Sequence, residues 1–310
     1  MTLFTIKNNM SNIRCSIYCG AKLGRILMNI KAVVTDLNGT LLLPSGTMGS
    51  FTKQVINQLI REGKKFFIAT GRSKNEIKEL ITSFHLHETN YITLNGGRVY
   101  DYNWQELISY DLAPLIAEDI LSGKKSRYKD FIHCIYKIEN QEDKLYVDMH
   151  DLHKINAEDN LIDKSNRKFE NIEIFADYNN IAAIIIGNRE DKLLEYENSL
   201  LQKHKCNINT FLSNPTTLEI VDIGASKGKA LKAATNQYKI ELNEIIAFGN
   251  GFNDLDMLST SGKGVMTENA NERLKKALPN IEIIAPSWNE SVAHYINNNI
   301  LLNPIKISES

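Results

Sequence analysis

The sequence predicts an α/β protein with a parallel sheet, helices on both of its faces, and an inserted α/β domain. In the first and last thirds of the chain, short apolar runs alternate with amphipathic helical segments, a pattern typical of parallel strands joined by helices. The middle third has strand-like runs and an amphipathic helix of its own, enough for a separate domain. The expected parts are a discontinuous core of residues 28–101 and 213–302, an inserted domain of residues 102–212, and tails of residues 1–27 and 303–310.

The core elements can be read from the chain in order. An apolar stripe at residues 55, 56, 59 and 60 marks the first helix, and a capping box of Ser73 and Glu76 opens the second. The expected core strands are Ile30–Val34, Phe66–Ala69, Tyr91–Leu94, Leu218–Val221, Ile245–Phe248 and Ile281–Ile284. The expected core helices are Phe51–Glu62, Ser73–Phe84, Lys227–Tyr238, one around Leu255 and Leu258, and Trp288–Asn297.

Composition excludes several classes of function. The chain has 310 residues, 43% hydrophobic content and a net charge of −1, which is ordinary for a globular protein without bias toward polyanions. The longest apolar run, Ile181–Ile186, falls far short of the about 18 residues that a membrane span needs. Residues 102–212 carry a net charge of −6, which argues against nucleic acid as a partner. The sequence leaves the oligomeric state open.

The cysteines and the first 27 residues of the chain give indications of its cellular location. The four cysteines are scattered through the chain, which is typical of reduced thiols in a cytoplasmic protein. Residues 1–27 contain four basic residues and no acid. We expect a mobile tail or an over-long start there, since Met28 directly precedes the first strand. An organelle-targeting peptide is the alternative.

Four short motifs each follow a short apolar run. In the first, an apolar strand ends at Asp36, and Gly39-Thr40 lets the backbone bend back toward that carboxylate. The other three are Thr70-Gly71-Arg72, Ser226-Lys227-Gly228 and Gly249-Asn250-Gly251-Phe252-Asn253-Asp254.

Taken together and in this order, the motifs resemble those of the haloacid dehalogenase (HAD) superfamily of aspartate-nucleophile phosphohydrolases. The string Ala69–Arg72, the bend Leu94–Gly97 and the run Ala247–Gly249 extend the resemblance. The segment between the second and third motifs is similar to the α/β cap of the Cof-like branch. The resemblance implies a Rossmann-like core with a cap over the site, and a Mg²⁺-dependent phosphatase of a small phosphorylated metabolite.

Phosphate transfer through a covalent intermediate needs groups that this set supplies. We expect Asp36 to be the nucleophile, because open α/β sheets place their sites at the carboxyl ends of strands. Thr70 offers a hydroxyl and Gly71 a backbone N–H to phosphoryl oxygens. Lys227 would be the fixed cation beside the nucleophile and the phosphate.

The remaining assignments follow from the resemblance. It implies a Mg²⁺ site formed by Asp36, Asn250, Asp254 and a backbone carbonyl, placed at Asn38. Asn38 also stands where the family has its acid–base residue and is therefore counted as catalytic with Asp36, Thr70 and Lys227. The residues expected to bind substrate are Thr40, Gly71, Arg72, Asn95, Gly96 and Asn253.

Two departures from the family pattern concern turnover. Asn38 and Asn250 stand where the family has Asp. An amide cannot transfer a proton to a leaving group or from water, and the loss of such help costs about 10²–10⁴ in rate. The sequence therefore leaves three readings open: a slowed phosphatase, a HAD-like binding or regulatory protein without hydrolysis, and a deliberately inactivated variant.

Overall fold

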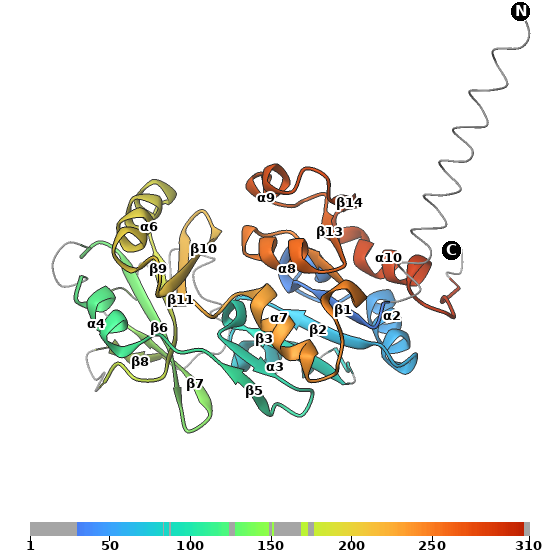
Figure 1. Ribbon diagram of the computed structural model, residues 1–310, viewed down its shortest axis with the longest axis horizontal. Helices are drawn as coiled ribbons and strands as arrows, with labels where there is room; N and C mark the ends of the chain where they lie inside the picture. The colour runs from blue at the N-terminus through green and yellow to red at the C-terminus, as the bar shows by residue number, and fades with distance from the viewer. Residues whose placement is uncertain are drawn as a thin grey trace, which may run out of the picture.

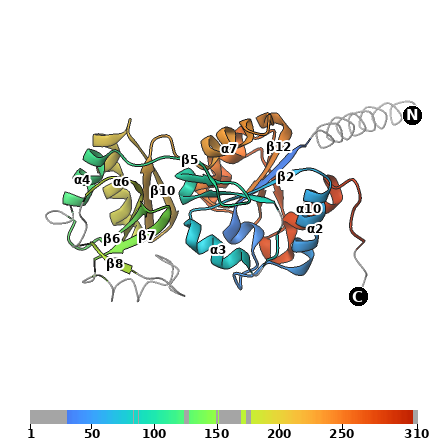
Figure 2. The ribbon, with the colours of Figure 1, turned by 90° about the horizontal axis from the view of Figure 1, so that it is seen from below.

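Two sheets organise the chain into two lobes that lie side by side (Figures 1 and 2). The computed structural model describes residues 30–82, 84–86, 88–123, 128–148, 151, 169–172 and 177–306. The expected tail of residues 1–27 lies outside this part of the chain.

The first sheet has eight strands in the order β14-β13-β12-β1-β2-β3-β4-β5. The pairs from β14 to β3 are parallel, and β3, β4 and β5 pair antiparallel. Their bounds are β1 Ala32–Thr35, β2 Lys65–Ala69, β3 Thr89–Thr93, β4 Arg98–Tyr100, β5 Glu106–Ser109, β12 Ile245–Gly249, β13 Lys263–Thr267 and β14 Glu282–Ile284. A Rossmann-like parallel core is thus confirmed.

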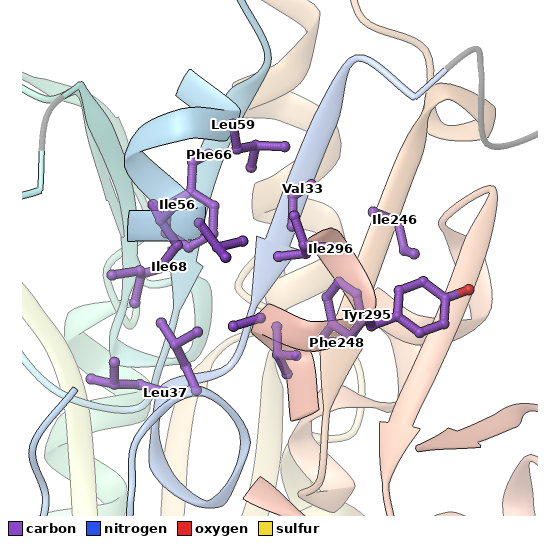
Figure 3. Packing of buried hydrophobic residues seen from close by; sticks show 14 of the residues in the cluster. Val33, Leu37, Ile56, Leu59, Phe66, Ile68, Ile246, Phe248, Tyr295 and Ile296 are labelled. Carbon is purple, nitrogen blue, oxygen red and sulfur yellow. The ribbon is translucent and has the colours of Figure 1, made fainter. Parts of the chain in front are cut away.

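Alternate residues of the central strands build two separate cores. Val33, Phe66 and Phe248 point to one face and pack against α2 (Ser50–Arg61), α3 (Lys74–Thr82) and α10 (Ser291–Asn299), as Figure 3 shows for several of them. Val34 and Phe67 point to the other face and pack against α7 (Lys227–Asn236), α8 (Leu255–Thr260) and α9 (Glu272–Ala277). Because both faces are covered, the strands read as continuous apolar runs.

The second sheet has six strands in the order β10-β11-β9-β6-β7-β8. Neighbours pair antiparallel, except β7 with β8. The bounds are β6 Ile132–Glu139, β7 Glu142–Val147, β8 Phe169–Asn171, β9 Ile181–Gly187, β10 Ile208–Asn214 and β11 Thr217–Asp222. Helices α4 (Pro114–Ser122) and α6 (Glu190–His204) cover one face of it.

The other face of the second sheet turns toward the core. Ile185 and Val221 cluster there with Leu94 and Ala225, which belong to the core loops. This sheet therefore forms a cap that packs directly on the part of the core where the motifs lie.

The chain passes from the core sheet to the cap sheet, and back again, at other residues than the sequence suggested. β5 pairs with β4 in the core sheet, although residues 102–212 were assigned to the insertion. β11 pairs with β9 in the cap sheet, so the expectation that Leu218–Val221 is a core strand was wrong. Alternating strands and helices reveal that a strand exists, but the pairing partner is decided only in the folded structure.

In the part of the chain that the structure describes, no helix is both long and apolar enough to span a lipid bilayer.

Candidate active site

Asp36 lies at the carboxyl edge of the core sheet, between two neighbouring strands. The register pairs Thr35 with Phe248 of β12 on one side and with Ile68 of β2 on the other. The Asp36 N–H extends the ladder by donating to the Phe248 carbonyl at 2.9 Å. The loops that follow β2 and β12 therefore start on either side of this carboxylate.

The turn after Asp36 brings the chain back over the β12 loop. Gly39 has φ +76°, and a Cβ there would lie 2.4 Å from the Asn250 Nδ2 atom. Glycine meets both demands, the left-handed backbone and the close approach. The Thr40 hydroxyl then donates to the Asn250 Oδ1 atom at 3.0 Å.

Lys227 joins two carboxylates beneath the surface. Its Nζ atom lies 2.7 Å from Asp36 Oδ1 and 2.6 Å from Asp254 Oδ1. The other oxygen of Asp254 accepts the N–H groups of Asn250 and Gly251 at 2.9 and 2.8 Å. Lys227 and Asp254 are fully buried, so this triad of net charge −1 is held largely out of water.

Burial and neighbouring charges shift the pKa values of Asp36 and Lys227. Burial raises the pKa of Asp36 to about 6, opposed by Lys227 and assisted by Asp254. Burial by itself would lower the pKa of Lys227, but the two carboxylates outweigh it and raise that pKa above its ordinary value. Lys227 is therefore a permanent cation beside Asp36.

The loop after β2 is held from both sides. The Thr70 hydroxyl accepts the Arg72 N–H at 3.2 Å, and the Thr70 carbonyl accepts the Asn95 N–H at 3.0 Å. The Arg72 Nε–H donates to the Asn38 Oδ1 atom at 3.1 Å, which ties this loop to the turn after Asp36.

A tight bend after β3 supports Lys227. Asn95 and Gly96 have φ +50° and +98°, and a Cβ on Gly96 would lie 2.3 Å from the Ser226 carbonyl oxygen. Only glycine lets the bend approach the start of α7, where Lys227 follows Ser226. The Asn253 Nδ2–H donates to Asn95 Oδ1 at 2.9 Å and joins the bend to the β12 loop.

The structure brings the predicted site residues together. Their roles stay predictions, but their placement at one edge of the core sheet follows from the contacts above. The residues gathered there are Asp36, Asn38, Thr40, Thr70, Gly71, Arg72, Asn95, Gly96, Lys227, Asn250, Asn253 and Asp254.

Sequence reasoning missed one group at this site, the cap carboxylate of Glu219. It accepts hydrogen bonds from Asn95 Nδ2 and Ser213 Oγ. Its two oxygens lie 3.1 and 3.2 Å from the position that a Cβ on Gly71 would take. The sequence feature that could have pointed to Glu219 is that it is the one acid within the otherwise apolar run Leu218–Val221.

The oxygen donors at this edge fit a hard divalent cation. Within the described ranges, no three His, Cys, Asp or Glu residues form a metal-binding group, so a cation here would rest on two carboxylates and neutral oxygens. The candidate ligands are the carboxylates of Asp36 and Asp254, the Asn250 amide oxygen and the Asn38 backbone carbonyl. The side chains of Asp36, Asn250 and Asp254 each already accept at least one hydrogen bond. An all-oxygen set of this kind suits Mg²⁺.

Comparisons with known proteins show the family of the chain. The family of haloacid dehalogenase-like hydrolases matches residues 33–296. A protein of Buchnera aphidicola subsp. Baizongia pistaciae, named provisionally as a phosphatase, is 33% identical over 273 residues, 86% of this chain and 96% of its own length.

The chain is also similar to a relative that is named for its activity and to a solved structure that shares its fold. The HMP-PP phosphatase of Cronobacter sakazakii is 28% identical over 279 residues, covering 85% of this chain and 93% of its own. The solved structure of a haloacid dehalogenase-like hydrolase from B. subtilis superposes with a TM-score of 0.74 at 22% identity. It covers 86% of this chain and 99% of its own, and at this identity it shows the fold alone.

Proposed function

This chain belongs to the haloacid dehalogenase-like hydrolases and is a phosphatase, and from that premise we propose a specific activity. We propose that it hydrolyses phosphomonoesters of a small metabolite with Mg²⁺, through an aspartyl-phosphate on Asp36. The observation that carries this proposal is the Lys227 ammonium held within hydrogen-bond distance of both Asp36 and Asp254 in a buried site.

The side chains divide the work of phosphate transfer. An Asp36 oxygen attacks phosphorus, the bond to the leaving oxygen breaks, and water later releases phosphate from Asp36. The Thr70 hydroxyl and the Gly71 N–H donate to phosphoryl oxygens, and Lys227 offsets the negative charge of nucleophile and phosphate. Arg72, Thr40, Asn95, Gly96 and Asn253 shape the surroundings in which the ester binds.

A divalent cation would complete the charge balance. Asp36, Asp254, Asn250 and the Asn38 backbone carbonyl would hold Mg²⁺, which would supply positive charge for the phosphoryl group. Asn250 contributes an oxygen without a charge, so we expect weaker Mg²⁺ binding than a site with a third carboxylate would give.

The amide of Asn38 limits the rate. Its Oδ1 atom accepts from Arg72, and neither amide atom can exchange a proton with a leaving group. We therefore propose slow turnover of ordinary esters and faster turnover of esters with good leaving groups.

The class of substrate is supported by relatives and by charge. The name HMP-PP phosphatase, carried by a relative, favours a small phosphorylated substrate. The inserted domain is acidic, which argues against nucleic acid. The four cysteines are scattered through the chain, which favours the expected cytoplasmic location.

A second candidate is a binding or regulatory protein that retains the pocket without turnover. It is favoured by one observation, the replacement of two expected acids by Asn38 and Asn250. In that case the protein would bind phosphorylated ligands with Mg²⁺ and release no phosphate.

One assay separates the two candidates. Phosphate release from p-nitrophenyl phosphate and from a panel of sugar phosphates is measured with Mg²⁺ and with excess chelator, beside Asp36→Asn. Mg²⁺-dependent release that Asp36→Asn abolishes supports the phosphatase. Activity that persists in Asp36→Asn overturns the nucleophile, and absence of release from every ester favours the binding protein.

A further inference from the structure

We propose that Glu219, a residue of the cap, transfers the proton in this site that Asn38 cannot transfer. The inference rests on the proposed phosphatase function and adds a catalytic residue to it.

Strand β11 aims Glu219 at the core. Its neighbours Leu218 and Ile220 point to the cap core beneath α4 and α6. Val221, which shares a face with Glu219, packs with Leu94 on the core side. The acid therefore lies on the cap face that covers the carboxyl edge of the core sheet.

Its contacts place the carboxyl group beside the phosphate-binding loop. Both oxygens lie close to Gly71, whose N–H is the proposed donor to the phosphoryl group. Asn95 holds one oxygen and Ser213 the other. An in-line displacement puts the leaving oxygen on the side of phosphorus opposite Asp36, hence toward the cap.

Glu219 suits proton exchange near neutral pH. Burial raises its pKa to about 7, while Ser213, Lys227 and Asn95 oppose that rise. Tyr136 of β6 also interacts electrostatically with it. A group of this kind holds a proton for part of the time and can accept one back.

The proton balance of the reaction then closes. Asp36 forms a bond to phosphorus, the bond to the leaving oxygen breaks, and that oxygen takes the electron pair and the Glu219 proton to leave as an alcohol. Water then attacks the phosphorus of the aspartyl-phosphate and gives a proton to the Glu219 carboxylate. Inorganic phosphate leaves, Asp36 is freed, and Glu219 is protonated again.

Two other acids near the site are engaged in helix capping. Glu76 accepts the Ser73 N–H at 2.7 Å, and Asp143 of the cap accepts the Lys74 N–H at 2.6 Å. Both hold the first turn of α3, whereas Glu219 contacts the phosphate loop and the Asn95 bend.

The test compares two esters in Glu219→Gln. The amide keeps the size and can still accept one of the two hydrogen bonds at its oxygen, but it carries no proton to transfer. We expect kcat/KM for an alkyl ester such as glycerol phosphate to fall about 10²-fold or more. With p-nitrophenyl phosphate, whose leaving group needs no proton, the fall should be less than about 10-fold. The exposed Glu195→Gln on α6 is the matched control.

Two further measurements exclude a structural explanation. The limb of the kcat/KM–pH profile near pH 7 should disappear in Glu219→Gln, and adding Asn38→Asp should restore alkyl ester turnover. Equal losses of kcat/KM on both esters, or no loss on either, would overturn the role of Glu219. The proposed phosphatase function would still stand if the activity of the parent protein is lost in Asp36→Asn. A parent protein inactive on both esters would overturn both.

Discussion

The Nζ atom of Lys227 lies 2.7 Å from Oδ1 of Asp36, although 191 positions separate the two residues in the chain. One residue follows the first strand of the core, and the other opens α7, after the whole cap. The cap is thus inserted in the sequence between the two halves of one charged site, and the contact between Lys227 and Asp36 forms in spite of the insertion.

Removal of Lys227 should cost both activity and stability. Lys227→Ala leaves the carboxylates of Asp36 and Asp254 buried without a cation, which destabilises folded proteins by about 3–5 kcal/mol. Denaturant unfolding measures the loss, and phosphate release should fall to background. The double variant with Asp254→Asn should recover part of the stability and none of the activity. A single variant as stable as the parent would contradict the buried ion pairs.

Neutralising Asp36 should abolish activity without lowering the stability of the fold. In Asp36→Asn, phosphate release should be abolished, while the melting temperature should stay equal or rise, because burial disfavours the ionised carboxylate there. Asp191→Asn, an exposed change on α6, serves as the control for both measurements. A fall of several degrees in Asp36→Asn alone would show that this carboxylate stabilises the fold.

Restoring an acid at position 38 should speed hydrolysis. Asn38→Asp keeps the acceptor that Arg72 uses and adds a transferable proton. Turnover of alkyl phosphates should rise by up to about 10²–10⁴-fold, with the larger gain where Glu219 is Gln. In Glu219→Gln, an ester with a good leaving group should leave trapped phosphate on Asp36, because neither residue 38 nor residue 219 then accepts the proton of the attacking water. No gain from Asn38→Asp and no trapped phosphate in Glu219→Gln would contradict the need for an acid–base group in this site.

Position 96, in the bend that packs against the start of α7, should not tolerate a side chain. Gly96→Ala adds left-handed strain of about 1–2 kcal/mol and a clash with the Ser226 backbone. Gly63→Ala is the matched control, since Gly63 has φ +80° and open space at its Cβ position. Unfolding experiments should show a clearly larger loss for Gly96→Ala, together with lower activity. Equal losses would mean that the close approach to Ser226 is not required.

The stability contribution of Glu219 should depend on pH. Its pKa rises from 4.5 in the unfolded chain to about 7 in the fold, so the folded protein keeps a proton that the unfolded chain has lost between these values. The free energy of unfolding therefore falls as pH rises through this interval. Glu219→Gln stays neutral, so its melting temperature relative to the parent should be higher at pH 8 than at pH 5. A constant difference would contradict the raised pKa.

The sequence by itself determined the core and most of the candidate site. Asp36, Thr70 and Asn250 each directly follow an apolar run that ends at one sheet edge, and parallel pairing brings such ends together. Their convergence therefore needed only the strand pattern and the order of the motifs.

Only the tertiary structure decided where the cap begins and what it adds to the site. β11 carries an apolar run that fits either sheet, and its pairing with β9 places it in the cap, whereas β5 joins the core sheet by pairing with β4 directly before it. Glu219 reads in the sequence as one acid in a strand. It becomes part of the site because β11 joins the cap sheet and turns this side chain toward Gly71 and Asn95, a contact that no local pattern encodes.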